Sequence, residues 1–144
     1  MSVPPIVSRD CFGVFDHDAD IGIVGRGTTL EEAFSAGASA MFDLQCRIEG
    51  VAPLHRVDLE FDEADLEFAF VAWLNGLLSL AHTQGLALGR FALTHVRDRW
   101  RGAGWGERWH AGLARGIDVK GATLTMLSVR EADGGWEARC VVDV

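Results

Sequence analysis

The chain has 144 residues, of which 49% are hydrophobic, and it carries a formal net charge of −8. This length and composition predict one domain with a hydrophobic core over residues 1–144 and exclude a disordered chain. No apolar run approaches the roughly 20 residues that span a bilayer, and residues 1–13 lack the basic start and apolar stretch of a signal peptide. We therefore expect a cytoplasmic protein without membrane attachment.

The negative charge disfavours direct binding of RNA or DNA, because such binding needs a cationic surface that displaces counterions. We expect direct RNA binding to be weak or absent. The basic stretch Arg97–Arg101 ("RDRWR") is a weak nucleic-acid signal, and an ordinary solvated strand or turn is the competing interpretation. The three cysteines are far apart in the sequence and odd in number, which favours free thiols over a disulfide framework or a zinc site.

The predicted elements begin with two short strands, Phe12–Phe15 and Asp20–Val24, the second with glycines that allow close approach of a neighbouring backbone. A helix follows over residues 28–44, where apolar residues recur at helical spacing. Thr29 is its expected N-cap, and Glu32 completes a capping box three residues later.

The next predicted strand is His55–Phe61, in which alternate residues are apolar. A second helix is expected from about Asp65 to Gln84, with acidic residues in its first turn and Gly85 as its C-cap. Because this helix is apolar over most of its circumference, we expect it to be the more buried of the two.

The remainder of the chain is predicted to be β structure. The expected strands are Leu86–Val96, Trp105–Leu113, Val119–Val129 and Trp136–Val144. A glycine-rich turn at residues 101–106 ("RGAGWG") separates the first two strands, and Asp133–Gly134 is the turn of the last hairpin. Two helices packed on a mixed, largely antiparallel β-sheet predict an α+β domain with two layers.

The stretch Phe15–Ile23 ("FDHDADIGI") places three aspartates beside a segment that must be buried. The spacing of Asp16, Asp18 and Asp20 is that of a calcium loop, but the glycine and glutamate that an EF-hand needs later in the loop are absent. In an extended strand the three carboxylates would project to one side and His17 to the other. Like charges this close repel unless a cation lies among them, so the stretch is either a solvated acidic turn or part of a cation site.

The end of the chain, "CVVDV", adds the side chain of Asp143 and the terminal carboxylate of Val144. If this strand ends beside Asp20, the result is a cluster of hard oxygens suited to Ca²⁺ or Mg²⁺. Lys120 is the only lysine among 13 basic residues, and arginine cannot replace a compact ammonium in a tight site. Lys120 is therefore either a charge partner of this cluster or a lysine retained by chance.

Four segments, in matching order along nearly the whole chain, resemble the archease family. They are residues 15–44 with "HDADIGI", residues 65–85 with "WLNGLL", residues 119–129 ("VKGATLTMLSV") and the final "VVDV". The resemblance implies an archease-like two-layer domain that is not an enzyme but activates an RtcB-type RNA ligase in tRNA splicing or RNA repair. The implied role is to promote guanylylation of the ligase histidine and to allow multiple turnover.

The same resemblance implies a divalent-metal site, with Ca²⁺ as the expected ion and Mg²⁺ or Mn²⁺ as alternatives. The family's two aspartates correspond to Asp20 and Asp143, and its lysine corresponds to Lys120. Asp18 replaces the usual threonine and adds a candidate ligand, and His17 is a candidate neighbour. The expected metal ligands are thus Asp20, Asp143, the carboxylate of Val144 and Asp18. Further departures at Gly121 and at Leu124–Thr125 leave the metal affinity and the partner interface open.

Two other functions remain open from the sequence. A general chaperone or adaptor would bind a metal only incidentally, whereas a metal-dependent phosphoester hydrolase would use the same carboxylates for catalysis. The chain has no G-x-S-x-G, P-loop or G-x-G-x-x-G motif after a strand. The ligase activator that the resemblance implies is the preferred hypothesis, and it agrees with an acidic cluster on a chain without a nucleophile motif of its own.

Overall fold

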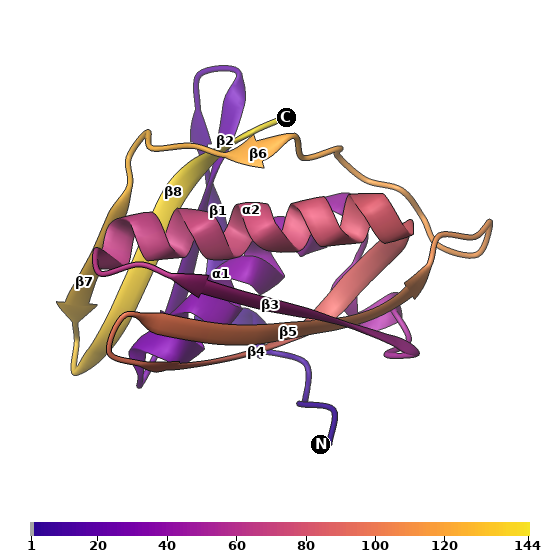
Figure 1. The fold of residues 1–144 in the computed structure, drawn as a ribbon. Helices are drawn as coiled ribbons and strands as arrows, with labels where there is room; N and C mark the ends of the chain where they lie inside the picture. The colour runs from indigo at the N-terminus through magenta and orange to yellow at the C-terminus, as the bar shows by residue number, and fades with distance from the viewer. Residues whose placement is uncertain (1) are drawn as a thin grey trace.

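The computed structural model describes residues 2–144 and shows two helices and two β-sheets (Figure 1). The predicted α+β class is confirmed, with the strands divided between two sheets. The elements in chain order are η1 (Arg9–Cys11), β1 (Phe12–His17), β2 (Asp20–Gly27), α1 (Leu30–Gln45), η2 (Ile48–Gly50), β3 (His55–Asp62), α2 (Leu66–Gln84), β4 (Leu86–Val96), β5 (Arg99–Arg108), β6 (Gly121–Ala122), β7 (Ser128–Ala132) and β8 (Gly135–Asp143).

The two sheets differ in how far apart their strands lie in the sequence. Sheet A has the order β1-β2-β8-β6, with β7 also paired to β8, and sheet B has the order β3-β5-β4. All the strand pairs within residues 2–144 are antiparallel. In sheet A the register of β2 and β8 runs from Ile21 opposite Val142 to Gly27 opposite Trp136. The start of β2 therefore adjoins the end of β8.

Helix α1 begins at the predicted cap and lies between the sheets. The Thr29 hydroxyl oxygen accepts a hydrogen bond from the Glu32 backbone N–H at 3.1 Å, and the same hydroxyl donates to the Glu32 carboxylate at 3.2 Å. Every residue in the range 33–42 is buried, because the helix contacts β2 and β8 of sheet A and β4 of sheet B. The prediction that the second helix is the more buried one is therefore wrong.

Small residues explain why α1 is enclosed so completely. A Cβ atom added to Gly25 of β2 would overlap the backbone nitrogen of Gly37 in α1, and one added to Gly37 would lie 2.6 Å from the Phe70 ring of α2. Glycine at these two positions lets three elements stack at close range. Helix α2 instead buries one face, and its apolar residue Phe68 remains 50% exposed.

An aromatic group joins both helices to sheet B. The indole N–H of Trp73 in α2 donates to the backbone carbonyl of Phe34 in α1 at 3.0 Å. The Phe34 ring stacks on Trp100 of β5, with their centroids 5.2 Å apart. Since all three side chains are fully buried, this group forms the centre of the hydrophobic core.

The glycine-rich stretch 101–106 lies inside β5 and is not the predicted turn. The chain reverses earlier, between β4 and β5, where Arg97 has a φ of 55°. A Cβ on Gly102 would overlap the Trp73 ring, and one on Gly106 would overlap the Ala87 carbonyl. These glycines therefore allow close packing within the sheet and against α2. In the sequence alone, a glycine-rich stretch of this kind cannot be distinguished from a turn.

The predicted last hairpin is confirmed at its turn, where Asp133 and Gly134 have φ values of 51° and 79°. The predicted strand Val119–Val129 is interrupted, however. Only Gly121–Ala122 forms β6, and the chain turns at Met126, which has a φ of 56°, before β7.

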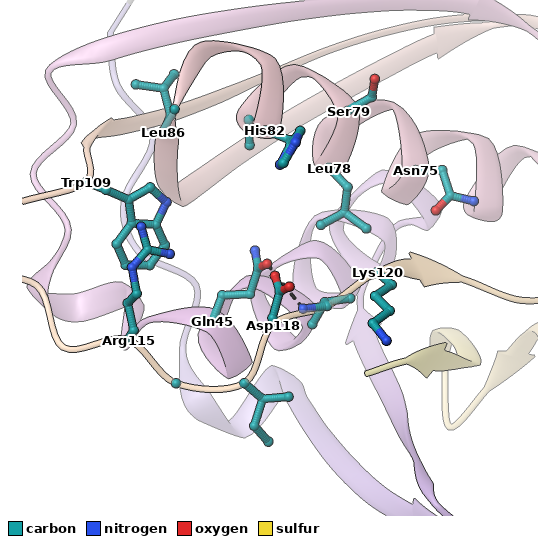
Figure 2. A pocket seen from close by; sticks show the side chains of 15 residues that line it. Gln45, Asn75, Leu78, Ser79, His82, Leu86, Trp109, Arg115, Asp118 and Lys120 are labelled. Atoms are coloured by element: carbon teal, nitrogen blue, oxygen red, sulfur yellow. Dashed lines mark hydrogen bonds between the residues drawn. The ribbon is translucent and has the colours of Figure 1, made fainter.

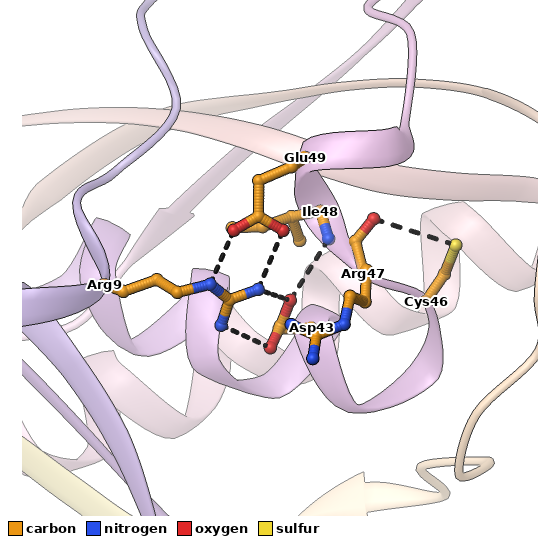
Figure 3. A network of polar contacts seen from close by, with 6 residues as sticks. All are labelled: Arg9, Asp43, Cys46, Arg47, Ile48 and Glu49. Atoms are coloured by element: carbon orange, nitrogen blue, oxygen red, sulfur yellow. Dashed lines mark hydrogen bonds and ion pairs between the residues drawn. The ribbon is translucent and has the colours of Figure 1, made fainter.

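The segment before β1 is fastened to the end of α1 by Arg9 (Figure 3). Its guanidinium donates to both carboxylate oxygens of Asp43 at 3.0 Å and to Glu49 of η2 at 2.7 Å. The hydrogen bonds to Glu49 and then to Asp43 raise the pKa of Arg9 further above its ordinary value. Within the part of the chain described, no helix is both long and apolar enough to cross a membrane.

The packing of β5 predicts a specific sensitivity to one methyl group. Gly102→Ala places a Cβ in the space of the buried Trp73 ring, and we expect it to lower the free energy of unfolding by about 1–3 kcal/mol. Gly50→Ala is the matched control, because nothing lies within 4 Å of its Cβ position. Urea unfolding of both variants measures the difference, and equal stability of the two would refute this account of the β5 glycines.

Candidate acidic site at one end of sheet A

The acidic stretch reverses direction instead of continuing as one extended strand. Strands β1 and β2 form a hairpin in which His17 pairs with Asp20 and Asp16 pairs with Ile21. The reversal occurs at Asp18, whose φ of 50° is a left-handed conformation that aspartate tolerates in turns. The interpretation as an acidic turn therefore fits this stretch. The segment is not one extended strand, and Asp16 and Asp20 lie on different strands and in different pairs.

Asp20 and Asp143 lie at adjoining strand ends. Asp20 is one residue before Ile21, and Asp143 is one residue after its partner Val142. Alternation along the strands puts both aspartates on the outer face of sheet A, the face opposite α1. Figure 1 shows the β1–β2 hairpin and the C-terminus at the same end of the molecule. The condition stated from the sequence, that β8 ends beside Asp20, is met.

His17 and Asp18, the other two residues predicted at the acidic site, differ in how close they lie to Asp20. His17 lies directly opposite Asp20 on β1, and its side chain is 34% exposed. The Asp18 side chain is 93% exposed at the tip of the hairpin, and its only ion pair is a 4.0 Å contact with His17 among the residues described. The structure therefore brings His17 to Asp20 and leaves Asp18 in solvent.

The donor set at this end of the sheet suits a hard cation only if water completes it. Within residues 2–144, no three His, Cys, Asp or Glu side chains gather closely enough to hold a metal ion. The side chains available as ligands are the carboxylates of Asp20 and Asp143, and the carboxylate of the adjacent Val144 stays a predicted ligand. Oxygen ligands of this kind fit Ca²⁺ and Mg²⁺, and both ions commonly retain bound water.

Lys120 reaches this end of the sheet through its backbone. Its N–H donates to the carbonyl of Asp143 at 2.8 Å, and the next residue, Gly121, pairs with Asp143 in β6. The Lys120 side chain lines a cavity of about 980 Å³ between α2 and the segment that precedes β6 (Figure 2). Its ammonium forms no ion pair with any carboxylate in the described chain, so it is available to a group from another molecule.

Asn75 positions β6, and the sequence analysis did not single it out. Its side-chain oxygen accepts from the Ala122 N–H at 2.8 Å, and its side-chain nitrogen donates to the Ala122 carbonyl at 3.2 Å. Asn75 therefore links α2 to the short strand that pairs with Asp143. The available signal was a polar residue within the apolar helical run "WLNGLL".

Other candidate groups in the sequence have structural roles here. All three cysteines are free, as predicted. Burial raises the pKa of the Cys140 thiol to about 12 and also raises that of Cys46, so both thiols stay protonated and are poor nucleophiles at neutral pH.

Two of the three arginines in the basic stretch 97–101 form ion pairs with carboxylates of sheet B. Arg99 forms ion pairs with Glu60 at 2.7 Å and Asp62 at 3.1 Å, and Arg101 pairs with Glu60 at 3.3 Å. The interpretation as an ordinary solvated turn and strand therefore fits this segment.

Comparison with known proteins gives a consistent result over most of the chain. A family model described as "Archease protein family (MTH1598/TM1083)" matches residues 12–144. The chain is 34% identical to the protein archease of Pyrococcus furiosus over 90% of this chain and 96% of that protein. It is 41% identical to the protein archease of Thermococcus gammatolerans over the same two shares.

Two solved structures have a similar fold. The solution structure of Methanobacterium thermoautotrophicum protein 1598 matches with a TM-score of 0.77 and 27% identity, covering 93% of this chain and 99% of that one. A crystal structure titled as an archease and possible chaperone from Thermotoga maritima matches with a TM-score of 0.64 and 17% identity, covering 90% and 94%. The latter likeness concerns the fold alone.

The contacts of β6 predict different costs for two substitutions. Asn75→Ala removes both side-chain hydrogen bonds to Ala122, and we expect it to lower the free energy of unfolding by about 1–3 kcal/mol. Lys120→Ala removes an exposed side chain without an ion pair, and we expect a change within about 0.5 kcal/mol. Chemical denaturation measures both, and a larger loss for Lys120→Ala than for Asn75→Ala would contradict these assignments.

Proposed function

Because this chain belongs to the archease family, we propose that it is a non-catalytic activator of an RtcB-type RNA ligase in the cytoplasm. It promotes guanylylation of the ligase histidine and allows multiple turnover in tRNA splicing or RNA repair. The observation that carries the proposal is the meeting of Asp20 and Asp143, from the two ends of the chain, at one end of sheet A.

A divalent cation, with Ca²⁺ expected, completes the proposed acidic site. When bound, it supplies a positive charge that neutralises the acidic groups and attracts phosphate oxygens. The chain contributes the carboxylates of Asp20 and Asp143 and the terminal carboxylate of Val144. The hairpin register pairs Asp20 with His17. Among the four metal ligands expected from the sequence, Asp18 has the least structural support, because its side chain lies in solvent.

The arrangement suits a protein that acts inside another protein's active site. Transfer of a nucleotide to a histidine requires an aligned triphosphate and stabilisation of the negative charge on its leaving group. The acidic strand ends would hold a cation, and Lys120 presents an ammonium that forms no ion pair within residues 2–144. Lys120 and the acidic groups are held to one another through the backbone bond to Asp143. A docked partner that covers this end of sheet A would therefore meet both residues.

A general chaperone is the second candidate function, and one observation favours it. The turn between β6 and β7 exposes Leu124 by 60% and Met126 by 52%. Exposed apolar side chains of this size are suited to contact unfolded clients. Suppression of aggregation of unrelated proteins by the wild type, lost in Leu124→Ser but retained in Asp20→Ala, would favour this function over ligase activation.

Calorimetric titration tests the acidic site directly. We expect the wild type to bind Ca²⁺, and Asp20→Asn and Asp143→Asn each to weaken binding by about tenfold or more, since each removes a charged oxygen ligand. Asp16→Asn is the matched control, because Asp16 lies nearby in the stretch but pairs with Ile21. A Gly-Gly extension after Val144 displaces the terminal carboxylate and should also weaken binding. Wild-type affinity in Asp20→Asn and Asp143→Asn would reject the site.

Guanylylation of a purified RtcB-type ligase tests the function. The wild type should increase the rate of guanylylation and the number of turnovers, and Asp20→Ala, Asp143→Ala and Lys120→Ala should each lose about tenfold or more of this stimulation. Asp133→Ala, in the distant turn between β7 and β8, is the control for removal of an exposed acidic residue. Full stimulation by all three folded site variants would show the site to be wrong. Phosphoester turnover without any ligase would favour the hydrolase hypothesis instead.

A further inference from the structure

The outer face of sheet A carries a second charged group, here called the arginine cluster. Arg26 of β2, Arg130 of β7 and Arg139 of β8 surround Glu137 of β8. Cross-strand pairing brings them together, since Arg26 and Arg130 both lie opposite Glu137. The guanidinium nitrogens of Arg26, Arg130 and Arg139 lie 3.3, 3.3 and 2.7 Å from the Glu137 carboxylate. The Glu137 side chain itself is only 7% exposed.

Three arginines share the two oxygens of one buried carboxylate. Burial alone would raise the pKa of Glu137, but the hydrogen bonds and charges of Arg139 and then Arg130 outweigh it and lower the pKa. Arg139 donates to one Glu137 oxygen through two nitrogens, at 3.1 and 2.7 Å. Arg26 and Arg130 add one contact each and remain 52% and 60% exposed. Their charges therefore exceed what the buried carboxylate needs.

Around Glu137 there are more arginines than carboxylates, whereas the other arginines described below have at least one carboxylate each. Arg9 is held by two carboxylates (Figure 3), Arg99 likewise contacts two, and Arg56 has one, Asp58. Among the ion-paired groups within residues 2–144, arginines outnumber carboxylates only around Glu137. A guanidinium has five N–H donors in a fixed fork. Within residues 2–144, Arg26 and Arg130 each donate one side-chain hydrogen bond, to Glu137, so most of their donors remain for another molecule.

We propose that the arginine cluster is a docking surface for an acidic patch on the protein partner. The inference rests on the proposed function and deepens it, because it assigns the face that the ligase covers. Arg139 precedes Asp143 by four residues on β8, which corresponds to about 13 Å along a strand. An ordinary interface buries about 800 Å² on each partner, so one docked protein spans both the cluster and the acidic strand ends.

The charge distribution favours a protein partner over a nucleic acid. The chain carries a net charge of −8, and Asp20 and Asp143 lie on the same face as the cluster. A continuous phosphate backbone crossing this face would meet both repulsive carboxylates. An acidic protein patch can be confined to the cluster, where carboxylates accept paired hydrogen bonds from arginine forks.

Affinity for the ligase tests the surface. In the full chain, Arg26→Ala combined with Arg130→Ala removes the two half-exposed arginines and leaves Arg139 bound to one oxygen of Glu137, while the other oxygen loses its contact with Arg26. Urea unfolding first establishes that this variant is folded. We expect this double variant to bind the ligase about tenfold or more weakly, and to show a smaller loss of affinity with added salt. The control is Arg56→Ala combined with Arg101→Ala, which makes the same change in net charge on sheet B and should stay within about threefold of the wild type. Calorimetric titration with Ca²⁺ should give the wild-type affinity for both double variants.

Three results would overturn the inference. The first is ligase affinity in the Arg26/Arg130 variant equal to that of the wild type while stimulation by the wild type is intact, in which case the proposed function stands without this surface. The second is an equal loss in the control, which would reduce the effect to net charge. The third is loss of binding to a labelled single-stranded oligoribonucleotide with ligase affinity unchanged, which would make the cluster a nucleic-acid surface. A wild type that neither binds nor stimulates the ligase would instead reject the proposed function, and the inference with it.

Discussion

The close approach of β2, α1 and α2 at Gly25 and Gly37 is the constraint on which the rest of the structure depends. With no side chain at either position, the backbone of α1 rests directly on sheet A, and Phe70 of α2 rests directly on α1. This contact fixes which face of β2 is buried. A slip of one residue in the pairing of β2 would turn every side chain of the strand to the other face. The same contact that builds the core therefore keeps Asp20 on the outside.

The outer face of sheet A gathers both charged groups of interest onto strand β8. Asp143 stands at the end of this strand, and Glu137 with its arginines stands near the beginning. Strand β2 completes both groups, with Asp20 at one end and Arg26 at the other. Acidic and basic groups are thus presented in a fixed order along two paired strands. A partner that recognises this order can dock in only one orientation, which would place the acidic end in a defined position.

Local chemistry allowed much of the fold to be predicted from the sequence. The Thr29 cap, the Gly85 helix end and the Asp133–Gly134 turn each depend on residues close in the chain, and each is found in the structure. Predictions failed where distant packing decides. The apolar circumference of α2 suggested deep burial, but α1 is the enclosed helix because its small residues fit between two sheets.

The residues of the candidate site show the same difference between what local sequence predicts and what long-range pairing decides. The family pattern and the acidic spacing identified Asp20 and Asp143, and the strand pairing brings them together. The sequence left a turn and an extended strand open at Asp18, because a three-aspartate run is compatible with both, and the structure shows the turn. The arginine cluster could not be found, since Arg26 lies far from Arg130 and Arg139 in the sequence and only the register unites them.

The pairing of β2 with β8 also determines when sheet A can form during synthesis of the chain. The first hairpin leaves β2 with an unpaired edge until the segment from Trp136 to Val142 has been synthesised and has returned to it. Pairing between strands so distant in sequence closes a large loop and is intrinsically slow. A growing chain would therefore expose a bare strand edge for most of its synthesis, a state prone to pairing with other chains. Both charged groups on sheet A need residues of β8, so a chain arrested before β8 is synthesised displays neither.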